Sequence, residues 1–145
     1  SLDSEWIATG SDVNAIILWD ANGRVCHERV AHGGRVNSLA FSPDNQHLAS
    51  TGEDYQGAVA ITSVASGRLH KTLRGHTDQL EAIAFNPDST RLATASNDHT
   101  VRVWDVQTGA SHVVLQQHLK GVEDATFSPD GKLLLSASSD KTIKI

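Results

Sequence analysis

Histidine is the residue type in this chain with the widest potential for chemistry, because its imidazole ring can bind metals, transfer protons or activate a nucleophile. The chain contains eight histidines and a single cysteine, Cys26. Their spacing matches neither HExxH nor CxxC, so no metal site and no cofactor are predicted. Cys26 stands directly before His27, but adjacent residues of a strand point to opposite faces and cannot pair as thiolate and base.

Several of the histidines belong to an internal repeat. A Phe-Ser/Asn-Pro-Asp motif begins at Phe41, Phe85 and Phe127, with steps of 44 and 42 residues. All three Phe and all three Pro of the chain lie in this motif, which chance placement would not produce. A histidine precedes each Phe by nine residues, at His32, His76 and His118. A Trp-Asp pair ends another run at Trp19-Asp20 and Trp104-Asp105.

The elements between these motifs have the pattern of short strands. Residues 80–85 alternate apolar and polar side chains, and residues 101–104 are rich in β-branched and aromatic types, as is typical of strands. Pro after Ser or Asn favours a tight turn, and Asn22-Gly23, Ser66-Gly67 and Thr108-Gly109 each supply a turn glycine. No stretch predicts a helix. The repeat length predicts an all-β fold of four-stranded antiparallel blades. From their shared phase, Phe41, Phe85 and Phe127 are expected at equivalent positions, buried between blades.

These motifs resemble those of the WD40 family, and the resemblance covers essentially the whole chain. Gly75-His76 and Trp104-Asp105 bracket one nearly complete repeat, with Asn97-Asp98-His99-Thr100 in a tight turn between them. The preceding repeat departs from the pattern, because Thr62-Ser63 replaces Trp-Asp and Tyr55-Gln56-Gly57 lengthens the turn. The resemblance implies a β-propeller.

By analogy with that family, each repeat contains a buried hydrogen-bonded set that fixes the register of its blade. The predicted members are His32, His76, Thr94, Ser96, Asp98, Trp104, His118 and Asp140. Either Thr94 or Ser96 supplies the hydroxyl on the strand, and Thr62 is too short to replace an indole donor in its own repeat. Burial argues against a hydrolase triad made of His76, Ser96 and Asp98, so no catalytic residue is predicted.

Counting strands predicts about fourteen of them in four segments. Residues 1–30 and 117–145 are expected to form partial blades, and residues 31–74 and 75–116 whole blades. The expected domain is therefore a WD40-type propeller arc equal to roughly half of a seven-bladed ring. Such an arc exposes sheet edges and blade faces, so the remaining blades of a longer chain or a second copy are expected to close it.

In the resembled family, partners often bind the rim where inner strands begin and the turns between second and third strands emerge. The residues mapped to this rim are Arg35, Asn37, Glu53, Gln79, Glu81, Asn97, Glu123 and Ser139. Glu53, Glu81 and Glu123 are expected at equivalent positions of three blades. Such an acidic arc suits a peptide that carries Lys or Arg.

Composition narrows the classes of function. Twelve Lys and Arg against seventeen Asp and Glu give a net charge of −5, which favours neither nucleic acid nor membranes as partners. The lone cysteine favours an intracellular location, cytoplasmic or nuclear. The expected function is a non-catalytic scaffold that presents a polar, mildly acidic rim to other proteins or peptides. The alternative is a small-ligand-binding or enzymatic propeller that uses its central channel.

Overall fold

The structure is a computed structural model in which residues 1–53 and 57–145 are described. These residues form 14 strands and no helix. The first sheet contains β1 (Trp6–Gly10), β2 (Ala15–Asp20) and β3 (Val25–Val30). The second contains β4 (Val36–Phe41), β5 (His47–Gly52), β6 (Val59–Ser63) and β7 (Leu69–Leu73). The third contains β8 (Leu80–Phe85), β9 (Arg91–Ser96), β10 (Val101–Asp105) and β11 (Ser111–Leu115). The fourth contains β12 (Val122–Phe127), β13 (Leu134–Ser138) and β14 (Ile143–Lys144).

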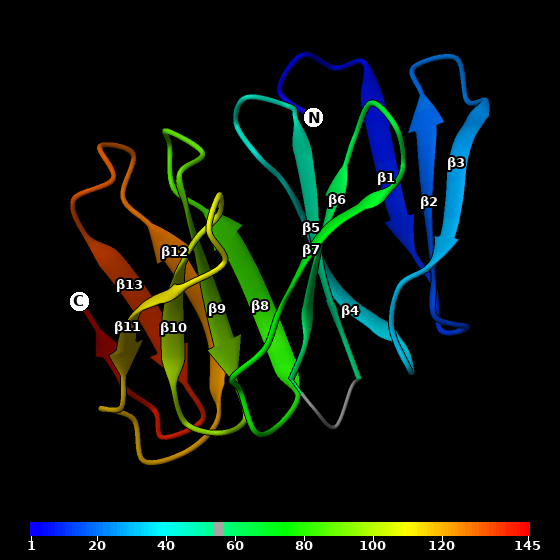
Figure 1. The fold of residues 1–145 in the computed structure, drawn as a ribbon. Coiled ribbons are helices and arrows are strands. Elements are labelled where there is room, and N and C mark those ends of the chain that lie inside the picture. Colours follow the sequence, from blue (N-terminus) through cyan, green and yellow to red (C-terminus); the bar gives the residue numbers. More distant parts are fainter. Residues whose placement is uncertain (54–56) are drawn as a thin grey trace.

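The four sheets lie side by side in chain order, from the blue β1–β3 to the red end of the chain (Figure 1). Each sheet is a meander in which every strand pairs antiparallel with its neighbour in the sequence. This arrangement is an arc of propeller blades. The prediction of an all-β arc of four-stranded antiparallel blades is therefore confirmed.

The hydrophobic core lies between the sheets. Between the first and second sheets, Ile16 and Leu18 pack with Leu48 and Val64. The largest cluster joins the second and third sheets and contains Val59, Ile61, Leu73, Leu80, Leu92 and Trp104. A smaller cluster of Ala95, Val101, Val122 and Ala125 joins the third and fourth sheets. Because each blade covers its neighbour, burial of this apolar surface holds the arc together.

The repeated Pro-Asp motif forms the turn between the first and second strands of a blade. The carboxylate of Asp44 accepts a hydrogen bond from the backbone N–H of Gln46 at 3.0 Å. Asp88 accepts the same bond from Thr90 at 2.9 Å, and Asp130 from Lys132 at 3.1 Å. An Asp at this position closes the turn by bonding its own backbone two residues on, which explains why the motif recurs.

The repeated Phe residues take equivalent places, each at the end of an inner strand. Their expected burial between blades is only partial, because Phe41, Phe85 and Phe127 are each half-buried, with Phe41 and Phe85 packed against the clusters between sheets. The chain turns away directly after each Phe, so one edge of the ring is left open. Phe127 lines a cavity between the third and fourth sheets instead of filling it.

Candidate functional site

A chain of hydrogen bonds crosses the third sheet. Nδ1 of His76 lies 2.7 Å from a carboxylate oxygen of Asp98, and its Nε2 lies 2.7 Å from the hydroxyl of Thr94. The indole N–H of Trp104 donates to the same hydroxyl at 2.9 Å. Since Asp98 can only accept, His76 donates from Nδ1 and accepts from Thr94 at Nε2. The bonds thus link the loop before β8, the turn after β9, and the strands β9 and β10.

Asp98 is the charged end of this chain of bonds. Its carboxylate also accepts the hydroxyl of Thr100 at 2.6 Å and the backbone N–H groups of Thr77 and Thr100. Burial raises the pKa of Asp98, but the hydrogen bonds from His76 and Thr100 outweigh it and hold the pKa well below its usual range. The group is therefore an ionised acceptor at neutral pH, which strengthens each of these bonds.

Parts of this arrangement recur in the two neighbouring sheets. His118 lies 3.0 Å from a carboxylate oxygen of Asp140 and 2.8 Å from the hydroxyl of Ser136. In the second sheet, Nε2 of His32 lies 2.9 Å from the hydroxyl of Ser50, which also bonds the carbonyl of Ala60 at 3.4 Å. Thr62 stands buried at the position of the Trp. Asp54, which corresponds by spacing to Asp98, lies outside the described residues, as do Tyr55 and Gln56 of the predicted insertion.

The structure places Ser96 outside the link between His76 and Trp104. Its hydroxyl bonds the backbone carbonyl of Gln79 at 2.9 Å and that of Asp78 at 3.3 Å, and accepts the N–H of Asp98 at 3.1 Å. Ser96 therefore ties the turn to the preceding loop. The hydrogen bonds of His76 go to Thr94, Asp98 and Thr100, and none goes to Ser96.

One part of the repeated set was missed from the sequence. In the first sheet, the indole N–H of Trp19 donates to the hydroxyl of Thr9 at 3.0 Å, as Trp104 does to Thr94. The signal is present in the sequence, because both pairs are ten residues apart. The hydroxyl of Thr142 bonds Asp140 at 2.6 Å, which repeats the bond between Thr100 and Asp98.

The rim is built on three β-bulges. The register of the inner strand shifts at Asn37 in β4, at Glu81 in β8 and at Glu123 in β12. A bulge re-aims its side chain relative to the sheet. Glu81 accepts a hydrogen bond from the amide of Asn97 at 2.7 Å, and Glu123 accepts one from the hydroxyl of Ser139. Two carboxylates are thus held at the start of neighbouring inner strands.

Glu53 does not share the position of Glu81 and Glu123, so the expected equivalence of the three is wrong. Glu53 follows β5, and its N–H donates to the carbonyl of Arg35 at 2.8 Å. Asn97 and Ser139 make the matching bonds, to Gln79 and Gly121 at 2.9 and 3.0 Å. Glu53 therefore occupies the position of Asn97 and Ser139, the residues that bond Glu81 and Glu123 in the other two sheets. In its sheet the bulge residue is the neutral Asn37.

Two further contacts join neighbouring sheets at the rim. The amide of Asn37 donates to the carbonyl of Leu80 at 3.1 Å. The guanidinium of Arg35 lies 3.4 Å from the carboxylate of Asp12, in the turn of the first sheet. Both charged groups are well exposed, so the ion pair contributes little to stability. The rim thus contains the exposed cation Arg35, as mapped from the sequence, and an additional acid, Asp12, that the mapping left out.

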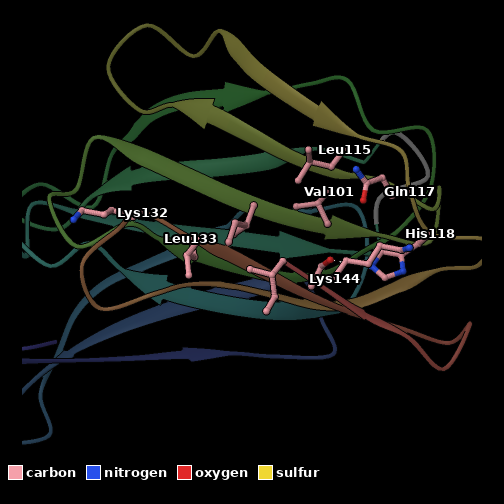
Figure 2. A pocket seen from close by; sticks show the side chains of 10 residues that line it. Val101, Leu115, Gln117, His118, Lys132, Leu133 and Lys144 are labelled. Carbon is pink, nitrogen blue, oxygen red and sulfur yellow. Dashed lines mark hydrogen bonds between the residues drawn. The ribbon is translucent and has the colours of Figure 1, made fainter.

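A cavity of about 210 Å³ lies between the third and fourth sheets. Figure 2 shows Lys132 at one end of it and His118 at the other, with Val101 and Leu115 between them. Half of its lining residues are aliphatic, and both ring nitrogens of His118 are already bonded. His118 therefore offers the cavity no unbonded ring nitrogen for acid–base chemistry.

Within residues 1–53 and 57–145, no helix is long and apolar enough to cross a membrane. Within the same residues, no group of three or more His, Cys, Asp or Glu side chains is arranged to hold a metal ion.

Radially packed meanders, with a His–Asp–hydroxyl set repeated in successive sheets, define a β-propeller built from sequence repeats. The family model "WD domain, G-beta repeat" matches residues 23–56, 67–105 and 109–145, more than half of the chain. The chain belongs to the WD40 repeat family.

Curated relatives with significant similarity align over part of the chain. The nuclear distribution protein nudF of Aspergillus terreus is 41% identical over 54 residues, 37% of this chain and 12% of that protein. The nuclear distribution protein PAC1 of Tuber melanosporum is 43% identical over 51 residues, 35% of this chain and 11% of that protein. The nuclear distribution protein PAC1-1 of Uncinocarpus reesii is 34% identical over 72 residues, 50% of this chain and 16% of that protein. The chain thus matches less than a fifth of the length of each relative.

Proposed function

We propose that this chain is part of a non-catalytic scaffold that binds other proteins through the rim of its blades. The rim residues are those named above: Arg35, Asn37, Glu53, Gln79, Glu81, Asn97, Glu123 and Ser139. The partner would be a protein or peptide segment that carries Lys or Arg. Membership of the WD40 family and the name shared by the relatives are compatible with this role, although neither identifies a partner.

The observation that carries the proposal is the fixed position of two rim carboxylates. Glu81 and Glu123 occupy the same bulge position in neighbouring blades, and Asn97 and Ser139 hold them by hydrogen bonds. A carboxylate that is already oriented loses less side-chain entropy when it binds a cation. Two such groups along one edge suit an extended segment with spaced basic side chains better than a diffuse negative surface does.

The histidine sets support a structural role over a catalytic one. His76 is 3% exposed and both its ring nitrogens are engaged within the blade. A general base must reach the proton that it removes from a substrate. A ring that is enclosed and doubly bonded instead holds its loop and turn together, which gives the rim a rigid base.

The proposal is tested with a double variant of the rim, Glu81→Gln with Glu123→Gln, in the full chain. Its control is Glu5→Gln with Glu28→Gln, two exposed acids away from the rim that change the net charge equally. The probe is a nine-residue arginine peptide, with a glycine–serine peptide of equal length as the neutral comparison. Two exposed ion pairs at about 0.2–1 kcal/mol each predict a two- to thirty-fold weaker binding to the rim variant.

The control variant should bind the arginine peptide nearly as tightly as the parent chain. The difference between the two variants should shrink as salt is added, because exposed charges are screened. Equal losses in the two variants would mean that the peptide senses only the net charge. That result would refute a specific acidic rim.

A further inference from the structure

Another cavity, of about 450 Å³, lies between the first and second sheets. Trp6 at the start of β1 lines it, together with His47 at the start of β5 and His70 in β7. Inner strands begin at the rim, and β5 begins where β4 ends, so this cavity lies at the opposite end of the blades. It is separate from the proposed partner-binding rim.

Two imidazole rings face this cavity as neighbours. The ring centroids of His47 and His70 are 5.1 Å apart, and their planes are inclined by 51°. Nδ1 of His47 is buried without a hydrogen-bond partner. A buried nitrogen that lacks a partner is costly, and a bound water or ion can satisfy it. Packing alone therefore does not account for the histidine at this position.

The separation of the rings matches that of two ligands on one metal ion. Zinc binds imidazole nitrogen at about 2.0–2.1 Å in tetrahedral geometry. Adding the distance from the nitrogen to the ring centre places the centroids of two such ligands about 5 Å apart. The ring centroids of His47 and His70 already have this spacing.

We propose that His47 and His70 form a two-imidazole binding site for a divalent transition-metal ion. Water fills the remaining coordination positions, because the cavity is open to solvent and large enough to hold it. Imidazole favours Cu²⁺, Ni²⁺ and Zn²⁺ over Mg²⁺ or Ca²⁺, which prefer oxygen ligands. Among the three, Cu²⁺ binds most tightly by the general order of divalent metal affinities.

Two histidines of the repeat are poor competitors for the ion. His76 and His118 each use both ring nitrogens within their blades. Asp44 contributes a negative charge near His47, but Ser42 and the N–H of Gln46 already bond its carboxylate. We therefore expect the two histidines, and not the acid, to supply the protein ligands.

The test uses the full chain, freed of metal by chelator and dialysis, and titrated with Ni²⁺ and Cu²⁺ in a calorimeter. All proteins carry Cys26→Ser, because the exposed thiol of Cys26 also binds soft metals. The decisive variant is His70→Ala, since His70 is exposed and its truncation leaves the core intact. His112→Ala is the control, because His112 is an exposed histidine on the outer strand of another blade.

We expect one ion per chain and at least about tenfold weaker binding in His70→Ala, since loss of an outer-shell partner alone weakens sites by about 10–100-fold. Bound Cu²⁺ should quench Trp6 fluorescence, and Ni²⁺ should broaden the ring proton signals of His47 and His70. His112→Ala should bind as the parent does. Equal affinity in His70→Ala and the parent, or broadening spread over all exposed histidines, would overturn the proposal. The rim experiment is independent of this result.

Discussion

Replacing Trp104 with Ala should be among the most damaging single substitutions in this chain. Its side chain is 1% exposed and belongs to the cluster that joins the second and third sheets. The ring lies edge-on to His76 at 6.2 Å between centroids, and the guanidinium of Arg102 lies 5.9 Å above it. Truncating a buried Trp to Ala costs about 3–5 kcal/mol, from lost burial and the cavity that remains. The full chain should lose that much of its free energy of unfolding.

The hydrogen bond to Thr94 accounts for a smaller part of this loss. Trp104→Phe keeps most of the ring and removes the donor, so the bond contributes about 0.5–1.5 kcal/mol to its cost. Thr94→Val removes the shared hydroxyl and leaves Nε2 of His76 and the indole N–H without a partner, which costs about 1–3 kcal/mol. Once Thr94 is Val, Trp104→Phe should cost less than it does in the parent. A double-mutant cycle of the two changes measures this coupling directly.

Trp19→Ala is the matched control. Trp19 makes the same bond, to Thr9 at 3.0 Å, but it is only partly buried. If burial sets the cost, Trp19→Ala must destabilise the chain less than Trp104→Ala does. Urea unfolding followed by circular dichroism gives both values. A loss below about 1 kcal/mol for Trp104→Ala, or a larger loss for Trp19→Ala, would refute the argument.

Two further predictions concern charge and backbone. The pKa of folded Asp98 lies below its ordinary 3.8, so its contribution to stability is complete above that pH and is lost as the pH falls. Urea midpoints measured from about pH 6 to pH 2 should therefore fall less steeply for Asp98→Asn than for a variant of the exposed Asp124; equal slopes would contradict this. Gly67 and Gly23 have φ of 63° and 78°, but a Cβ on Gly67 would lie 2.4 Å from the ring of His27, whereas a Cβ on Gly23 meets nothing. Both Gly→Ala changes should cost about 1–2 kcal/mol for the backbone, and thermal unfolding should show an additional loss for Gly67 alone.

The architecture could be predicted because scarce residue types mark the same phase of each repeat. The Phe, Pro and Asp of the turn recur at nearly constant steps, and each turn between strands has its own local chemistry. Strand pairing follows directly, since short turns allow only antiparallel neighbours. Burial of the three Phe rings could not be predicted in the same way, because it depends on how far the next blade covers the end of each strand.

The sequence alone could have identified Thr94, and not Ser96, as the hydroxyl that bonds His76 and Trp104. Both hydroxyls lie on the same face of β9, so strand alternation does not separate them. The phase of the repeat does, because Ser50, Thr94 and Ser136 each follow a repeated His by eighteen residues. The position of Ser96 holds Gly52 in the preceding repeat, which cannot supply a hydroxyl. The hydroxyl that bonds the repeated His is therefore found at the position that carries Ser or Thr in each of these repeats.

At the rim, the position of a residue within the repeat predicts its equivalents in other blades better than its charge does. Glu53 resembles Glu81 in type, but the repeat aligns it with Asn97 and aligns Asn37 with Glu81. The inner strand has its bulge at the same position in both blades, at Asn37 and at Glu81. The acid and its neutral partner have thus exchanged places between neighbouring blades. The second, third and fourth sheets each keep one carboxylate at the rim, so this edge stays acidic despite the exchange. The direction from which a basic side chain can approach that carboxylate differs between the second sheet and the other two.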